Sequence, residues 1–127
     1  MPAEPVPTPN APPVAGPYSP AVRAGDWLVL AGQVGFDPGS GTLPDSVEDQ
    51  ARQALANVAT VLADCGASLA DVAKVTVFTT ALGNISAIND IYGEAFGDHR
   101  PARSTVGVAG LPARASIEIE VWAYKPV

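Results

Sequence analysis

Residues 101–124 read PARSTVGVAGLPARASIEIEVWAY and contain two stretches typical of β-strands, Arg103–Val108 and Ser116–Tyr124. In the second stretch apolar and polar residues alternate, and alternate side chains of a strand point to opposite faces of a sheet. One face carries Ile117, Ile119 and Val121, and the other carries Glu118, Glu120, Trp122 and Tyr124. The pattern therefore predicts a strand with one face in a core and an acidic, aromatic opposite face.

The first strand raises a question about its charge. Arg103, Thr105 and Gly107 share one face of it, and hairpin-like pairing of the two strands would bring Arg103 within reach of a glutamate. One interpretation is a cross-strand ion pair, which contributes little to stability when exposed. The other is a site in which a single arginine binds a small anion. The pattern alone leaves both interpretations open.

The remaining chain supplies two helices and three more strands. SVEDQARQALANVATVLADCG has apolar residues at helical spacing, with Ser46 and Asp49 as a capping pair and Gly66 as a stop. A second amphipathic helix is expected at Asn84–Phe96. The other expected strands are Ser19–Ala24, Trp27–Phe36 and Ala73–Thr80. The order ββαβαββ predicts an α+β domain with both helices on one face of a mixed sheet, and the other face then needs a cover, which indicates self-association.

One expected strand, Trp27–Phe36, is interrupted by a glycine. Its core, WLVLAGQV, is nearly continuously apolar, as in strands that are covered on both faces. Gly32 weakens such a strand, and it marks either a bulge or bend or the close approach of a ligand or another backbone. The sequence does not decide between these.

The first residues form a distinct segment. Eight of the thirteen prolines lie within residues 1–20, and proline removes a hydrogen-bond donor and blocks helix. We therefore expect residues 1–14 to form an extended, mobile arm. Residues 15–127 are expected to form a single domain.

Charge and composition exclude several functions. The net charge is −6, and two lysines and five arginines are scattered along the chain, which disfavours binding to nucleic acid or to an anionic membrane. Cys65 is the only cysteine, so no intrachain disulfide can form. The single histidine, His99, has no partner at metal-ligand spacing. Without a signal peptide or an apolar run near 18 residues, a cytoplasmic location is expected.

Three segments carry a resemblance to a known family: GPYSPAVRAGDWLVLAGQVGFDPGSG, QARQALANVATVL and PARSTVGVAGLPARASIEIE. From Gly16 to Tyr124 the chain resembles the Rid family of enamine and imine deaminases, also called the RidA or YjgF family. The resemblance implies a chorismate-mutase-like fold and a homotrimer with clefts between subunits. It also implies hydrolysis of 2-enamine and 2-imine acids to 2-keto acids and ammonia, without a metal or organic cofactor.

The resemblance assigns roles to six residues. Arg103 matches the arginine that binds the substrate carboxylate, and Glu118 matches the glutamate that activates water. The substrate-binding positions are matched by Tyr18, Gly32, Asn89 and Thr105. The guanidinium fork suits a carboxylate, and a partly buried carboxyl group can move protons, so this chemistry fits the residue types.

The chain also departs from the family pattern. Ala31 stands where many family deaminases have serine, and Thr105 where they often have cysteine. Gly107 and Gly110 replace charged residues of well-known members. Two alternatives therefore stay open: a non-catalytic module that binds or senses small carboxylates, and a pathway-specialised relative that acts on a different imine.

Overall fold

The strand β7, Ile117–Tyr124, lies inside a mixed sheet and has neighbours on both sides. The computed structural model describes residues 2–127. The other strands are β1 (Glu4–Pro5), β2 (Ala21–Ala24), β3 (Trp27–Leu30), β4 (Gln33–Val34), β5 (Val72–Thr79) and β6 (Ala102–Gly107). The sheet order is β1-β2-β3-β7-β5-β6, and β4 also pairs with β7. The helices are α1 (Val47–Asp64) and α2 (Ile85–Phe96), with short 3-10 turns η1 (Leu69–Asp71), η2 (Leu82–Asn84) and η3 (Pro112–Arg114).

The predicted pairing of β6 with β7 is wrong, because β5 lies between them. β5 pairs parallel with β6, placing Val75 beside Arg103, and antiparallel with β7, placing Phe78 beside Glu118. The physical reason is the connection through α2: a strand, a helix and a returning strand form a parallel crossover unit. The strand that closes the sheet edge is therefore β6, and it reaches β7 only through β5.

The predicted strand Trp27–Phe36 is divided at Gly32. Val29 pairs with Trp122, and Gln33 pairs with Ile119. Between these two pairs the segment from β3 to β4 covers four residues, whereas β7 covers only three. One extra residue on one side of an antiparallel ladder is a β-bulge. The bulge separates β3 from β4, so one of the two interpretations of the glycine is confirmed.

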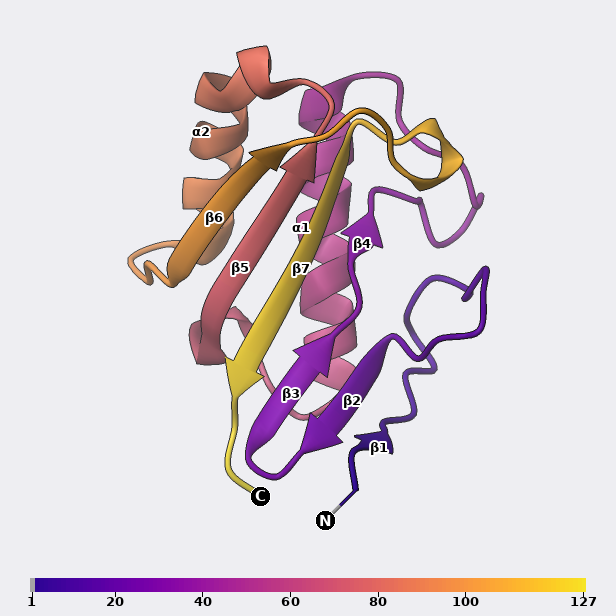
Figure 1. Cartoon of the computed structure of the whole chain (residues 1–127), viewed down its shortest axis with the longest axis vertical. Helices are drawn as coiled ribbons and strands as arrows, with labels where there is room; N and C mark the ends of the chain where they lie inside the picture. The colour runs from indigo at the N-terminus through magenta and orange to yellow at the C-terminus, as the bar shows by residue number, and fades with distance from the viewer. Residues whose placement is uncertain (1) are drawn as a thin grey trace.

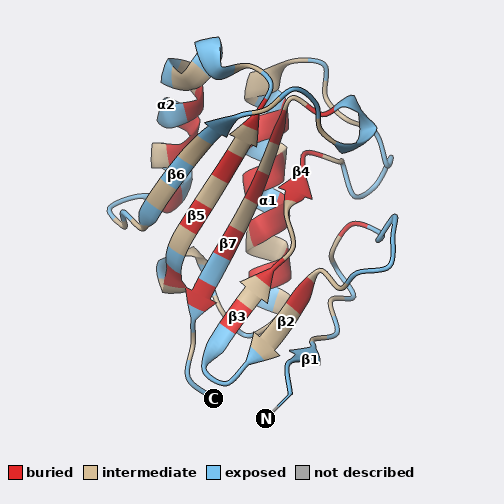
Figure 2. Ribbon diagram, viewed as in Figure 1, coloured by how far each residue is buried: buried red, intermediate tan, exposed pale blue. Residues whose placement is uncertain are grey.

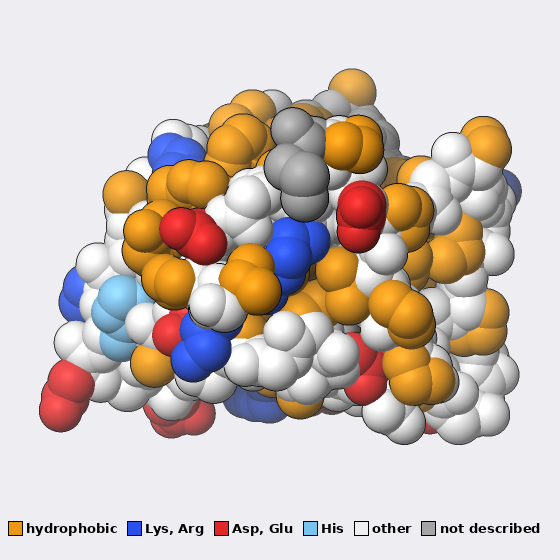
Figure 3. Space-filling model, turned by 90° about the horizontal axis from the view of Figure 1, so that it is seen from below, with side chains coloured by type: hydrophobic (Ala, Val, Ile, Leu, Met, Phe, Trp, Pro, Cys, Tyr) orange, Lys and Arg blue, Asp and Glu red, His pale blue; other side chains and the backbone are white. Residues whose placement is uncertain are grey.

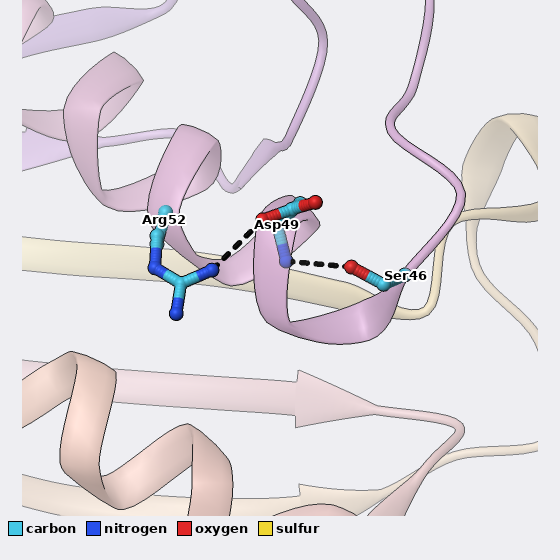
Figure 4. Close-up of polar contacts among 3 residues, drawn as sticks. All are labelled: Ser46, Asp49 and Arg52. Carbon is cyan, nitrogen blue, oxygen red and sulfur yellow. Dashed lines mark hydrogen bonds and ion pairs between the residues drawn. The ribbon is translucent and has the colours of Figure 1, made fainter.

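Local signals in the sequence explain the bounds of α1. The backbone N–H of Asp49 donates to Ser46 Oγ at 3.1 Å, which confirms the expected cap, and Arg52 Nη1 donates to Asp49 Oδ1 at 2.8 Å (Figure 4). The helix ends at Asp64, and Gly66 follows with φ of +77°, a conformation that glycine adopts without strain. Within residues 2–127 no helix combines the length and the apolar character needed to cross a membrane.

Both helices cover the same face of the sheet, as predicted (Figure 1). Figure 2 shows buried residues alternating along β5 and β7 and lining the inner sides of the helices. The core is apolar and includes Leu28, Val58, Leu62, Val75, Val77, Ile88, Ile117, Ile119 and Val121. No helix in the described part of the chain covers the opposite face, and Trp27, Trp122 and Tyr124 are 39%, 46% and 48% exposed there. These aromatic rings contact one another, and burying them against another surface would lower the free energy of the protein.

The proline-rich segment is extended, and it contacts the domain at several points. The expected mobility of residues 1–14 stays a prediction. β1 pairs with β2, and the Val6 N–H donates to Ala21 O at 3.0 Å. Asn10 donates to both carboxylate oxygens of Asp64, from its backbone at 3.0 Å and its side chain at 2.6 Å. Pro12 is buried. The arm therefore forms part of the described surface beside β2.

Candidate active site

Arg103 lies on the edge strand β6 and faces α2. Its register partner on β5, Val75, is fully buried beneath the helices, so the two side chains share that face. The Arg103 Nη2 donates to Asn89 Oδ1 at 2.8 Å, and the Arg103 Cζ lies 4.6 Å from the centre of the Tyr92 ring. Asn89 and Tyr92 are three residues apart and therefore neighbours on one side of the helix. One helix face thus holds the guanidinium at two points.

The Arg103 guanidinium borders a hollow of about 300 Å³, whose lining is Asn89, Tyr92, Gly93, Arg100, Pro101 and Arg103. Arg100 donates to the backbone carbonyls of Gly97 and, at 3.0 Å, His99, at the end of α2. Among residues 2–127 no carboxylate lies within 4.0 Å of Arg103. The ion-pair interpretation is therefore wrong for the single chain. An uncompensated guanidinium with free N–H groups can bind a carboxylate in a bidentate manner.

Glu118 occupies the other face of the sheet, in the middle strand β7. Its side chain lies over Gly32: a methyl group added to that glycine would be 2.7 Å from Glu118 Cδ. The missing side chain at Gly32 therefore leaves room for the side chain of Glu118, whereas the close approach of a ligand or another backbone stays a prediction. Burial, and to a smaller extent the charge of nearby Glu120, raises the pKa of the Glu118 carboxyl above its ordinary value. Such a carboxyl exchanges protons closer to neutral pH than an exposed one does.

A second hollow, of about 160 Å³, surrounds Glu118. The residues that line it are Pro12, Pro13, Val14, Ala15, Tyr18, Pro20, Gly32, Gln33, Val34, Phe36, Pro112, Ala113 and Glu118. The structure thus brings Tyr18, Gly32 and Glu118 together. It also adds a wall from the proline-rich arm and one from the loop at Ala113, which the sequence analysis missed. The arm is far from Glu118 in sequence, and its composition gives no sign of where it packs.

Within one chain, the residues expected at one site lie on two faces. Arg103 and Asn89 lie on the helix-covered face, whereas Glu118 lies on the open face together with Phe78, its register partner. Two strand spacings, roughly 10 Å, also separate β6 from β7. Thr105 shares the face of Arg103, beside Val77, but lines neither hollow. The chain therefore carries two half-sites, one that can bind an anion and one with an acid–base carboxyl group.

The fold and these half-sites define an α+β protein with an arginine that can bind an anion and, on the other face, a carboxyl group suited to proton transfer. The family model described as Endoribonuclease L-PSP matches residues 8–125. A RutC family protein of Pyrococcus horikoshii is 44% identical, with 93% of this chain and 94% of the relative covered. A 2-iminobutanoate/2-iminopropanoate deaminase of Capra hircus is 40% identical over 93% of this chain and 87% of the relative. The chain therefore belongs to this family, the YjgF or Rid family, as the resemblance predicted.

A solved structure of a relative has the same fold as this chain. The crystal structure of Escherichia coli TdcF with bound serine superposes with a TM-score of 0.91 at 38% identity, covering 96% of this chain and 98% of that one. The predicted α+β class, with a mixed sheet and two helices, is confirmed. Serine, the ligand in that crystal structure, carries an α-carboxylate.

Proposed function

We propose that this protein hydrolyses 2-imino acids, and the 2-enamine acids that tautomerise to them, to 2-keto acids and ammonia without a cofactor. The observation that carries the proposal is the Arg103 guanidinium, held by Asn89 and Tyr92 at a hollow and free of any carboxylate partner among the described residues. Relatives about 40% identical that carry the name 2-iminobutanoate/2-iminopropanoate deaminase support it. Glu118, with its raised pKa, supplies the acid–base group.

The chemistry requires positioning and proton transfer only. Arg103 binds the substrate carboxylate and fixes the adjacent C=N carbon. Glu118 accepts a proton as a water oxygen bonds to that carbon and the C=N π electrons move to nitrogen. Glu118 returns this proton to the nitrogen, which gives a neutral amino group on the tetrahedral carbon. Glu118 then takes the hydroxyl proton and passes it to the same nitrogen as the C–N bond breaks and the C=O bond forms. One water is consumed and one ammonia released, with no change in oxidation state.

The assembly completes the site. Because Arg103 and Glu118 of one chain lie on opposite faces, we propose a homotrimer in which Arg103 of one copy faces Glu118 of the next. Trp27, Trp122 and Tyr124 give the open face an apolar surface that a second copy can bury. Cyclic assemblies use such heterologous contacts, in which two different surfaces of the same chain meet. Tyr18 and Gly32 then complete the side of the cleft that carries Glu118.

The family model's description raises a second candidate, cleavage of RNA. Charge argues against it, because phosphate backbones are bound by clustered bases and this chain has a net charge of −6. Figure 3, viewed from the end at which both termini lie, shows lysine and arginine side chains interspersed with acidic and apolar ones on that face. We expect no saturable RNA binding at any salt concentration.

A dehydratase-coupled assay tests the proposed function. Threonine dehydratase releases 2-iminobutanoate, and the wild-type protein should speed the formation of 2-oxobutanoate, whereas Arg103→Ala should not. Arg52→Ala is the matched control, because Arg52 is an exposed arginine on α1 that pairs, among residues 2–127, only with Asp49. Saturable binding of 2-oxobutanoate without faster release would instead identify a non-catalytic binding module.

A further inference from the structure

Tyr92 has a feature that the proposed chemistry does not use. It is only 7% exposed, and its hydroxyl oxygen is buried without a hydrogen-bond partner among residues 2–127. Its ring lies against the Arg103 guanidinium and, at 4.6 Å between ring centres, against the Phe96 ring one turn further along α2. Tyr92 thus connects the helical core to the arginine of the hollow.

The hydroxyl is not suited to proton transfer. Burial raises the pKa of the Tyr92 phenol, and this outweighs the opposing effect of the Arg103 and Arg100 charges. The phenol therefore stays neutral at physiological pH, and it offers neither a base nor, being buried, a contact for a ligand. A buried polar group without a partner disfavours folding. The ring, and not the hydroxyl, is the part of Tyr92 that contacts the site.

Two contacts restrain the guanidinium in complementary ways. The hydrogen bond to Asn89 Oδ1 uses Nη2 and limits rotation of the group within its plane. The ring face of Tyr92 limits its tilt, since a cation is attracted to the face of an aromatic ring. An arginine side chain otherwise samples many rotamers, and ordering it on binding weakens affinity.

We infer that Tyr92 is a positioning residue that holds the Arg103 guanidinium over its ring and directs the remaining N–H groups into the hollow, ready for a carboxylate. The inference rests on the proposed function and deepens it. Tyr92 touches no substrate in this scheme and acts through Arg103. Its ring should therefore affect carboxylate binding, while the chemical step at the C=N carbon stays nearly unchanged.

The test uses three single variants of the full chain, measured by NMR spectroscopy and by ligand binding together with turnover. Tyr92→Leu removes the ring, Tyr92→Phe keeps it, and Phe96→Leu is the matched control: it opens a similar gap in the same helix, where Phe96 is 6% exposed, and leaves the ring beneath Arg103. The first readout is the ring-current shift of the Arg103 side-chain protons in ¹H–¹⁵N NMR spectra. The second is the dissociation constant for 2-oxobutanoate from calorimetry, with kcat from the coupled assay.

The expected results distinguish a specific effect of the Tyr92 ring on Arg103 from a general loss of packing in the helix. Tyr92→Leu should lose the upfield shift of the Arg103 protons and weaken 2-oxobutanoate binding about fivefold, with kcat within about twofold. Tyr92→Phe and Phe96→Leu should keep both the shift and the affinity. In an Arg103→Gln background, Tyr92→Leu should have no further effect on the residual affinity, because the cation that the ring contacts is already gone.

Contrary results are equally clear. An unchanged Arg103 shift or unchanged affinity in Tyr92→Leu overturns the inference, as does an equal loss of affinity in Phe96→Leu. Weaker binding by Tyr92→Phe would assign the role to the hydroxyl and overturn it too. If the wild-type protein binds 2-oxobutanoate but hydrolyses no imine, the hydrolase proposal fails while binding still decides the role of Tyr92. A wild-type protein that binds no 2-oxobutanoate contradicts both.

Discussion

Gly32→Ala should reduce catalysis with little loss of stability. The added Cβ would lie 2.7 Å from Glu118 Cδ and 2.8 Å from its Cγ, whereas ordinary contact begins at 3.4 Å. The carboxyl group must therefore retreat from 2.7 to 3.4 Å, about 0.7 Å. Because a displacement of about 1 Å can cost about 100-fold in rate, we expect kcat to fall roughly 10- to 100-fold, about 1.4–2.7 kcal/mol in activation free energy.

The coupled dehydratase assay and urea unfolding measure these two effects separately. The atoms in the way belong to the end of a flexible side chain, so the free energy of unfolding should change by less than about 1 kcal/mol. Gly83→Ala is the matched control, because a Cβ at Gly83 meets nothing within 4 Å. A kcat for Gly32→Ala within threefold of wild type would refute the reasoning that Glu118 must stay in place over this glycine.

Three further predictions concern protonation, backbone strain and a buried amide. Burial and the charge of Glu120 raise the pKa of Glu118 in the folded state. Protonated Glu118 therefore contributes to stability fully at a pH below its ordinary pKa of 4.5, and this contribution is lost as the pH rises through the raised pKa. In urea titrations, Glu118→Gln should therefore be more stable than wild type at neutral pH, and this advantage should be absent below pH 4.5. Because Glu120→Gln removes the neighbouring charge, it should lower the pKa of Glu118 and move the acid limb of kcat/KM to lower pH. Ala113 has φ of +57°, so Ala113→Gly should raise the free energy of unfolding by about 0.5–1 kcal/mol. Gly25 has φ of +61° and open space around it, so the reverse change Gly25→Ala should lower the free energy of unfolding, as measured in thermal melts. Asn57 is 1% exposed, and its side-chain amide donates to the backbone carbonyls of Val34 and Phe36 at 3.0 and 2.9 Å. Asn57→Ala should therefore lower the free energy of unfolding by about 2–4 kcal/mol. Equal urea midpoints for Asn57→Ala and wild type would contradict this.

Local features of the fold were predictable from the sequence. The Ser46 cap, the stop at Gly66 and the alternation along β7 each depend on residues close in the chain, and each is confirmed. The side of the sheet that the helices cover also follows from apolar periodicity. These signals depend on short-range geometry, which a single sequence carries directly.

Strand order and long-range packing were not predictable in the same way. Period-2 alternation gives the face on which Arg103 and Glu118 lie but not the strand that separates them, so the inserted β5 was missed. Tyr92 lies within the helix predicted at Asn84–Phe96, but no role at the site was predicted for it. Its spacing of three residues from Asn89 was a usable signal, since both face the same side. Nothing in the proline-rich arm indicated that Pro12 would border the hollow around Glu118.

In the proposed trimer, the two half-sites of one chain combine with those of neighbouring copies into complete sites. The helix-covered edge provides Arg103 with Asn89, and the open face provides Glu118 over Gly32. Neither half contains both the anion-binding group and the acid–base group. Activity should therefore require assembly, even though each chain folds around its own apolar core.

Subunit mixing tests this claim most directly. Arg103→Ala and Glu118→Gln are each purified, confirmed as oligomers by analytical ultracentrifugation, and then denatured and refolded together in equal amounts. If a site takes Arg103 from one copy and Glu118 from the next, about one quarter of the clefts in randomly mixed cyclic trimers regain both residues, and the mixture should show about one quarter of wild-type activity. A mixture that forms mixed oligomers but stays as inactive as the separate variants would contradict the account.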